Sequence, residues 1–413
     1  MNTKKPRTLV DELRGASRLA IEATRGVTDL VESMHVTVAG GPDLLGRPLA
    51  GIAQALTRPV YASIRGATGI VGAGIDRALA QLAPLVGASE AGPEREMLLA
   101  ALNGVLGDYL AESNNPLAVE MRFRRGGQAL TLERAALAAA FPEAAAKVLV
   151  LVHGSCMNDR MWRRDGHDHG AALARELGLS PLYLHYNSGL HVSTNGRAFA
   201  ELLEQLAAAW PVPLTELVIL AHSMGGLVTR SACHIAEADG LSWRQKLRAI
   251  LFLGTPHDGA PLERGGNWID TALGVSRYSA PLARLGKIRS AGVTDLRFGN
   301  VLDEHWEGRD RFALDGDPRA TLQLPNGVDC YAVVGTTAGG PGRKLRGDGL
   351  VPLDSALGRH DTPELVLRFP ASRCSIAYGV THLDLLSSPD VYATLRGWLA
   401  SYGGSSSDPL SGR

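Results

Sequence analysis

The sequence predicts an α/β fold built on an open, mostly parallel sheet, and three observations lead to this prediction. Continuous apolar runs such as KVLVLVHG and LVILAH are typical of strands that are buried on both faces of a sheet. Helical patterns separate several of these runs, over residues 171–177, 198–210 and 227–238. Strand and helix alternate as far as residue 402, so we expect helices on both faces of the sheet.

Residues 1–113 are predicted to form a helical region ahead of the sheet. Apolar residues recur at helical spacing within 9–34, 64–86 and 97–110, and Pro93-Glu94 suits the first turn of a helix. We expect two to four helices that act as a scaffold or as the surface of a homo-oligomer. Peripheral contact with a lipid or polymer surface is the alternative, which the alternating acids and bases and the absence of Trp disfavour.

The sheet itself is predicted within a domain of residues 114–402, followed by a disordered tail of residues 403–413. Apolar and polar residues alternate on both sides of Gly126-Gly127, which indicates a β-hairpin. The predicted strands after the hairpin lie within residues 147–154, 181–187, 217–222, 248–256, 329–335 and 364–370. The strand pattern lapses within 255–325, where we expect an insertion that is either a mobile lid over the cleft or an ordinary packed wall.

The composition excludes some classes of function. Forty-two basic residues balance 42 acidic ones, so there is no basic excess for a nucleic-acid partner. The four cysteines are widely scattered without metal-ligand spacing, which favours buried free thiols. The N-terminus lacks the apolar core of a secretory signal, and there is no charge-free apolar run of transmembrane length. These features predict a soluble, cytoplasmic protein.

The stretch LTELVILAHSMGGLVTRSA, residues 214–232, carries the strongest functional signal. It places Ser223 where a buried strand turns into a helix, with Ala221 and Gly225 as small neighbours. Such a sharp turn exposes the hydroxyl and leaves room only for small side chains two positions away. The start of the helix offers free N–H groups to a developing negative charge. We interpret Ser223 as a nucleophile; a serine that only caps the helix is the alternative.

At this motif the sequence resembles the α/β-hydrolase family, and within it the serine esterases and lipases with an H-S-M-G-G elbow, formed here by His222 to Gly226. Ala221 replaces the first glycine of the usual G-x-S-x-G. The resemblance covers residues 117–402 and includes the T-P-H-x-G-A segment within residues 253–261. It implies an α/β-hydrolase fold and a chain order of serine, acid and histidine.

By this resemblance Asp348, in the segment GDGLVP, is the acid, and His382, in the loop before the final helix, is the base. The imidazole takes the serine proton, and the carboxylate fixes the tautomer of the imidazole. The same resemblance makes His153-Gly154-Ser155 an oxyanion loop, with the Ser155 and Met224 N–H groups as donors. The rivals are Asp354, Asp361 and Asp384 for the acid, and His360 for the base.

The predicted chemistry needs no cofactor and no metal. The DGHDH segment at residues 165–169 contains metal-ligating residue types, but a short polar loop before a helix brings them together by chance. We therefore predict a carboxylic-ester hydrolase, an esterase or lipase, acting on small-molecule, lipid-like or polyester substrates. An acyltransferase or thioesterase with the same triad and a non-catalytic binding protein on the same fold are the alternatives.

Overall fold

The computed structural model describes residues 93–112, 114–260, 290–309, 322–341 and 347–402. The chain divides into two compact units, Met1–Gly92 with Tyr109–Ala118, and Pro93–Asp108 with Val119–Arg413. Most of the first unit, including the helical patterns within residues 9–34 and 64–86, lies outside the described residues. Residue 113 also lies outside the described residues, so the domain boundary that we predict between residues 113 and 114 stays a prediction.

In the described residues, eight strands form one sheet in the order β2-β1-β4-β3-β5-β6-β7-β8. β1 pairs antiparallel with β2 and with β4, and all other neighbours are parallel. The strands are β1 (Arg122–Arg125), β2 (Gln128–Ala129), β3 (Lys147–Val152), β4 (Ser180–His185), β5 (Glu216–His222), β6 (Leu247–Leu253), β7 (Asp329–Thr336) and β8 (Cys374–Tyr378). The open, mostly parallel sheet that we predicted is therefore confirmed.

The predicted hairpin forms at the edge of this sheet. Gly126 and Gly127 have φ values of +58° and +81°, which suit the turn that joins β1 to β2. Two successive positive φ values are accessible to glycine without steric cost, so the glycine pair fixes the site of the turn. On the other side of β1, Phe123 pairs with Leu184 of β4 and is fully buried.

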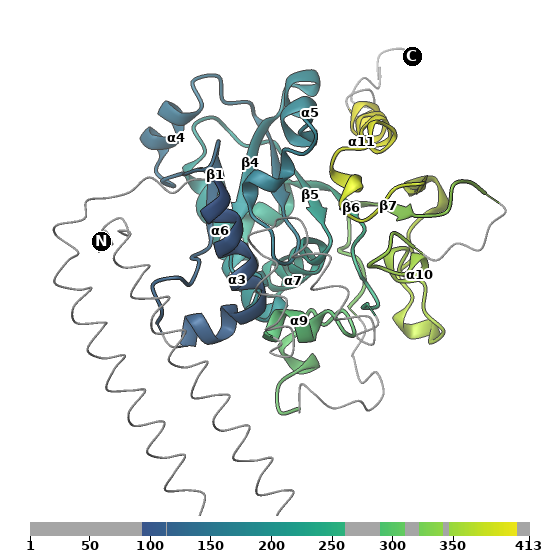
Figure 1. The fold of residues 1–413 in the computed structure, drawn as a ribbon. Helices are drawn as coiled ribbons and strands as arrows, with labels where there is room; N and C mark the ends of the chain where they lie inside the picture. Colours follow the sequence, from purple (N-terminus) through teal and green to yellow (C-terminus); the bar gives the residue numbers. More distant parts are fainter. Residues whose placement is uncertain (1–92, 113, 261–289, 310–321, 342–346, 403–413) are drawn as a thin grey trace, which may run out of the picture. The chain divides into compact units, whose positions relative to one another are not determined.

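Helices cover both faces of the sheet. The main α-helices of the domain are α3 (Pro93–Glu112), α4 (Arg134–Ala140), α5 (His169–Leu177), α6 (Val192–Ala209), α7 (Met224–Ala238), α9 (Ala291–Asp295), α10 (Leu353–Ala356) and α11 (Pro389–Tyr402). α5 and α11 lie side by side on one face, where Leu173 and Leu395 pack on the buried leucines of β3, β5 and β6 (Figure 1). α6 and α7 pack together on the other face.

The order of the strands places two loops next to each other at one edge. β4 and β5 lie on opposite sides of β3, so the chain reverses direction across the sheet at this point. In open α/β sheets such a reversal leaves a crevice at the carboxyl ends of the strands, and ligands bind there. The loop after β3 begins at His153, and the turn after β5 contains Ser223. The fold therefore brings the predicted oxyanion loop to the predicted nucleophile.

One predicted strand is wrong, and two helices start earlier than the pattern suggested. The apolar run of residues 364–370 is not a strand; a short 3₁₀ turn, Pro363–Leu365, and a loop occupy it. Leu367 and Phe369 are instead used in loop packing, Leu367 against Gly358 and Phe369 against Phe252. The last strand is β8, and its neighbour is β7. α5 and α6 begin at His169 and Val192, ahead of the patterns of residues 171–177 and 198–210, whereas α7 begins at Met224, directly after the serine, as predicted.

The predicted insertion of residues 255–325 is described only in part, because residues 261–289 and 310–321 lie outside the described residues. Its described part contains α9 and a 3₁₀ turn, Asp303–His305. Whether the insertion is a lid stays a prediction. In the described part of the chain, no helix combines the length and the apolar character needed to cross a membrane.

Candidate active site

Ser223 lies in a strained turn between β5 and α7. Its backbone has φ +55° and ψ −128°, a conformation that side-chain-bearing residues rarely adopt and that costs about 1–3 kcal/mol. Hydrogen bonds hold the turn on both sides: Ser223 N–H donates to Leu253 O of the neighbouring strand at 2.9 Å, and Gly226 N–H donates to Ser223 O at 3.0 Å. The side chain stands at the carboxyl end of the sheet, at the start of a 15-residue helix.

Two glycines beside this serine are required by close contacts. A Cβ on Gly225 would collide with Val152 O and lie 2.7 Å from His153 O, so no larger residue fits without moving the end of β3. A Cβ on Gly154 would lie 3.0 Å from Ser223 Cβ and 3.1 Å from His222 Nδ1. The loop after β3 therefore packs directly against the serine turn, as the predicted oxyanion loop should.

Asp348 and His382 form a buried pair. His382 Nδ1 lies 2.7 Å from Asp348 Oδ2, and the backbone N–H of His382 donates to Asp348 O at 3.0 Å. The second carboxylate oxygen, Oδ1, accepts from the N–H groups of Leu350 and Val351 at 3.0 and 2.8 Å. Both oxygens thus accept hydrogen bonds, and the contact with Oδ2 places the histidine proton on Nδ1.

His222 connects the histidine loop to the serine turn. Its Nε2–H donates to His382 O at 3.0 Å, and the two imidazole rings lie 4.7 Å apart between centroids. Burial and the neighbouring His382 hold the pKa of His222 well below its usual range, so the ring stays neutral.

Nε2 of His382 has no hydrogen-bond partner among the described residues, although it is buried. This free lone pair is what a general base needs.

The predicted oxyanion loop is buried and held by side-chain contacts. His153 is fully buried, its Nδ1–H donates to Gly154 O at 2.8 Å, and its ring stacks on Tyr186 with 4.3 Å between centroids. Burial lowers the pKa of His153 to about 3, so it acts as a neutral shaping residue of the loop. Ser155 and Met224 are also buried, with exposed fractions of 4% and 0%.

The rival residues are occupied by local contacts. Asp384 accepts from both the N–H and the hydroxyl of Thr381, in a turn next to His382. Asp354 is exposed and pairs with Arg359 at 3.4 Å, and His360 Nδ1 accepts from Thr362 N–H at 2.9 Å. Asp361 is exposed. None of these four residues forms the contact to His382 that Asp348 forms.

Several residues that support the histidine loop were not predicted from the sequence. His169 Nε2–H donates to Leu385 O at 3.0 Å, three residues beyond His382, and Arg164 Nη2 lies 3.5 Å from Asp384 Oδ1. Both belong to the segment around DGHDH. In that segment His167 Nε2 lies 2.8 Å from His169 Nδ1, and Asp168 caps α5. Within the described ranges, no group of three or more His, Cys, Asp or Glu side chains is arranged to hold a metal ion.

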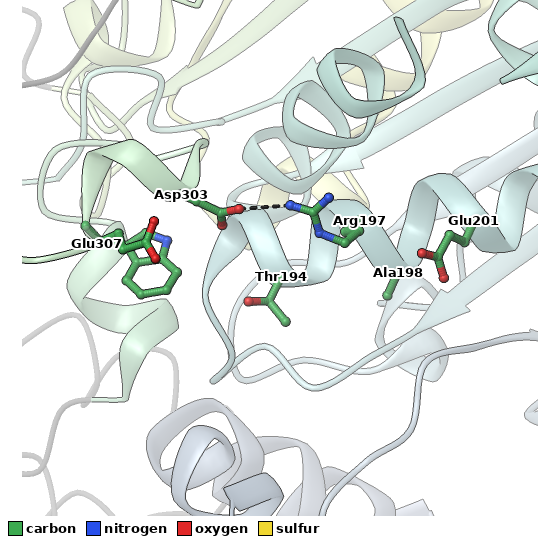
Figure 2. Close-up of a pocket in the computed structure, with 7 residues that line it drawn as sticks. Thr194, Arg197, Ala198, Glu201, Asp303 and Glu307 are labelled. Atoms are coloured by element: carbon green, nitrogen blue, oxygen red, sulfur yellow. Dashed lines mark hydrogen bonds and ion pairs between the residues drawn. The ribbon is translucent and has the colours of Figure 1, made fainter. Parts of the chain in front are cut away.

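A hollow of about 360 Å³ lies away from these residues, between α6 and the segment that begins with the 3₁₀ turn Asp303–His305 (Figure 2). It is lined by Thr194, Arg197, Ala198, Glu201, Asp303, Trp306 and Glu307. Arg197 and Asp303 form an ion pair across it at 2.9 Å, and the Trp306 indole stacks on His191 at 3.7 Å between centroids. No residue of the predicted catalytic set lines this hollow.

Part of the chain matches a known family in sequence. Residues 144–313 match a family described as the PGAP1-like alpha/beta domain, which is a hydrolase family. The matched range contains the loop after β3 and the serine turn, and it ends before Asp348 and His382. No curated protein is detectably similar to this chain.

Among solved structures, the chain is similar to the mature form of Bacillus licheniformis lipase BlEst2, with 16% identity and a TM-score of 0.40 over 61% of this chain and 91% of that chain. It is similar to Aspergillus fumigatus lipase B, with 14% identity and a TM-score of 0.39 over 67% and 59% of the two chains. For Pyrococcus furiosus esterase Pf2001 the identity is 13% and the TM-score 0.36, over 63% and 83%.

The mostly parallel eight-stranded sheet, the strained serine turn after β5 and the match to a hydrolase family agree with one another. The sheet of this chain has the α/β-hydrolase fold and residues 144–313 match a hydrolase family, in agreement with the resemblance of the motifs to serine esterases and lipases.

Proposed function

We propose that this protein is a serine hydrolase that cleaves carboxylic esters through an acyl-serine intermediate. The observation that carries the proposal is the buried Asp348–His382 pair, in which Nε2 of His382 has no hydrogen-bond partner among the described residues. The carbonyl oxygen of His382 accepts a hydrogen bond from His222, the residue before Ser223. A neutral imidazole with its proton on Nδ1 can accept a proton only at Nε2, which is the arrangement that activates a serine hydroxyl.

In the proposed reaction, Ser223 Oγ attacks the ester carbonyl while its proton moves to His382 Nε2. The negative charge on the former carbonyl oxygen is stabilised by the N–H groups of Ser155 and Met224. His382 returns the proton to the leaving alkoxide as the C–O bond breaks, and the acyl group stays on Ser223. Water then attacks this acyl-serine with His382 again as base, which releases the carboxylic acid and restores the serine.

The test is hydrolysis of p-nitrophenyl esters, from acetyl to palmitoyl, by the wild type, Ser223→Ala and a control variant. Ser242→Ala is a suitable control, because Ser242 lies in a 3₁₀ turn beyond α7 and donates to Glu204 at 2.7 Å. The proposal expects wild-type rates in the control and a loss of about 10³-fold or more in Ser223→Ala. The acyl length with the highest rate separates an esterase from a lipase.

Two outcomes would replace the proposal. Equal rates in the wild type and Ser223→Ala would exclude this serine as the nucleophile. Formation of a new ester when an alcohol is added, at the expense of the free acid, would make the protein an acyltransferase with the same triad.

A further inference from the structure

Helix α3 approaches the predicted oxyanion loop more closely than any side chain would allow. A Cβ on Gly104 would collide with Cys156 Sγ and lie 2.8 Å from Cys156 Cα and 2.9 Å from Cys156 N. Two of these three contacts are to backbone atoms, which cannot rotate away as the end of a long side chain can. Gly104 therefore lets α3 rest on the backbone of the residue that follows Ser155.

Cys156 is held in an unfavourable conformation at this contact. Its φ is +60°, in the left-handed region, which costs a residue with a side chain about 1–3 kcal/mol. The surrounding contacts must supply that energy. Cys156 N–H donates to Ser188 Oγ at 3.0 Å, and both side chains are buried. Burial raises the pKa of the Cys156 thiol to about 11, so the thiol is inert packing and not a nucleophile.

The loop after β4 links the same helix to the same place. Asn187 Nδ2 donates to Gly107 O of α3 at 2.8 Å, Ser188 accepts from Cys156, and Tyr186 OH donates to His153 O at 2.8 Å. Three successive residues thus bridge α3 and the loop of residues 153–156. A third segment also contacts α3: Ser290, which precedes α9, donates from its Oγ to Gly104 O at 2.6 Å.

A charged network supports the far end of the loop. Glu96 of α3 lies 2.6 Å from Arg160 Nε and 3.2 Å from Arg124 Nη1, and Arg124 in turn lies 3.1 Å from Asp159 Oδ1. Asp159 is buried, and it lies in the 3₁₀ turn Asp159–Trp162 that ends the loop. α3 therefore holds the segment from Cys156 to Arg160 at two points, one apolar and close, the other charged.

We propose that α3 and the loop after β4 position the oxyanion donor, and that Gly104 and Ser188 are positioning residues for catalysis. The inference rests on the proposed function, since it assigns Ser155 N–H as the donor. Cys156 N is bonded to the carbonyl carbon of Ser155, so a shift of Cys156 moves the Ser155 backbone with it. A donor misplaced by about 1 Å can lower a rate about 10²-fold without changing how the substrate binds.

The experiment compares Gly104→Ala, Ser188→Ala and the matched control Gly397→Ala. Gly397 also lies within a helix, α11, and a Cβ there would meet no atom within 4 Å. For each variant, ester hydrolysis is measured as kcat per reactive serine, titrated with a fluorophosphonate, together with KM. The account predicts a kcat at least about tenfold lower in Gly104→Ala, about threefold to tenfold lower in Ser188→Ala, and a KM within about twofold.

A second-site change separates positioning from general damage. Adding Cys156→Gly to Gly104→Ala removes the nearest of the three contacts, that to Sγ, and leaves the two backbone contacts. Glycine also adopts the positive φ without strain, so kcat is expected to recover in part, at least about threefold over Gly104→Ala alone. A merely structural role would lower the fraction of reactive serine and leave kcat per reactive serine unchanged. That result, or an equal kcat in Gly104→Ala and Gly397→Ala, would overturn the inference.

If the wild type cleaves no ester, the proposed function fails and the inference is tested by amide hydrogen exchange of residues 154–157. Faster exchange in Gly104→Ala and Ser188→Ala than in Gly397→Ala would support the role of α3 in holding this loop. Equal exchange in all three variants would overturn it.

Discussion

Asp348 shows how one residue can set the chemistry of another. Its Oδ1 accepts two backbone N–H groups, and its Oδ2 faces His382 Nδ1. This leaves the imidazole a single arrangement, with the proton on Nδ1 and the lone pair on Nε2. Asp348 and His382 were predicted from the resemblance of the GDGLVP segment and of the loop before the final helix to the α/β-hydrolase family. The link from His222 to His382 O was not, because it joins residues 160 positions apart through the geometry of two loops.

Asp348→Asn should abolish most activity without a large change in structure. The asparagine oxygen must stay with the Leu350 and Val351 N–H groups, so its NH₂ faces His382 Nδ1 and forces the proton onto Nε2. With this tautomer the histidine cannot accept the serine proton, and we expect kcat to fall about 10³- to 10⁴-fold. The measurement is kcat for a p-nitrophenyl ester.

Asp384→Asn is the matched control, because Asp384 lies in the same loop and bonds Thr381. Its activity should stay within about threefold of the wild type. A larger loss in Asp384→Asn than in Asp348→Asn would mean that the acid is assigned to the wrong residue.

The elements of the sheet follow from local sequence where apolar runs are continuous. The continuous runs correctly predicted four strands, β3, β5, β6 and β7. A strand that is buried on both faces has apolar residues at successive positions, so its run is continuous and easily recognised. The run of residues 364–370 has the same composition and is not a strand. Its apolar side chains are buried by loop contacts, for instance Phe369 against Phe252, and no local pattern distinguishes this kind of burial from burial in a sheet.

At the turn between β5 and α7, the two small positions of the elbow should respond differently to substitution. Gly225→Ala would force the added carbon against the carbonyl oxygens of Val152 and His153, so we expect about 1–3 kcal/mol of destabilisation and at least about 10²-fold lower kcat. Ala221→Gly adds no atom, and we expect a loss of about 1 kcal/mol with kcat within about threefold. Urea unfolding and ester hydrolysis measure the two effects. Wild-type kcat in Gly225→Ala would contradict the account of this turn.

At the scale of the whole molecule, the domain buries many neutral histidines. Burial lowers the pKa values of His153, His169, His185, His222 and His257. The burial of these histidines could not be predicted from their positions in the sequence, because segments distant in the chain bury them. His169, for example, is held by Leu385, 216 positions away.

These histidines predict that acid destabilises the fold. In the unfolded chain each takes up a proton near pH 6.5, whereas in the folded chain it stays neutral to a lower pH. The unfolded state therefore binds more protons below pH 6.5, and stability that is complete above that pH is lost as the pH falls. With pKa values of about 3 for His153 and about 4 for His169, each accounts for about 2 kcal/mol at pH 5.

Urea unfolding at pH 7.5, 6 and 5 measures this loss. His169→Gln keeps a donor for Leu385 O but does not titrate, so its loss of stability between pH 7.5 and 5 should be smaller by about 2 kcal/mol. The neighbouring His167, whose Nε2 lies 2.8 Å from His169 Nδ1, is present in both proteins, so the two proteins differ in a single histidine. An unchanged loss in His169→Gln would show that this histidine is already charged in the folded protein.

The central claim is that Ser223 is a nucleophile activated by His382. Its most direct test is the mass of the intact protein after reaction with a fluorophosphonate, in the wild type, Ser223→Ala and His382→Ala. The account predicts one added phosphonyl group on the wild type, located at Ser223 by peptide mapping. It predicts none on Ser223→Ala and a rate at least about 10²-fold slower on His382→Ala. Equal labelling of the wild type and Ser223→Ala, or a label on another residue, would contradict it.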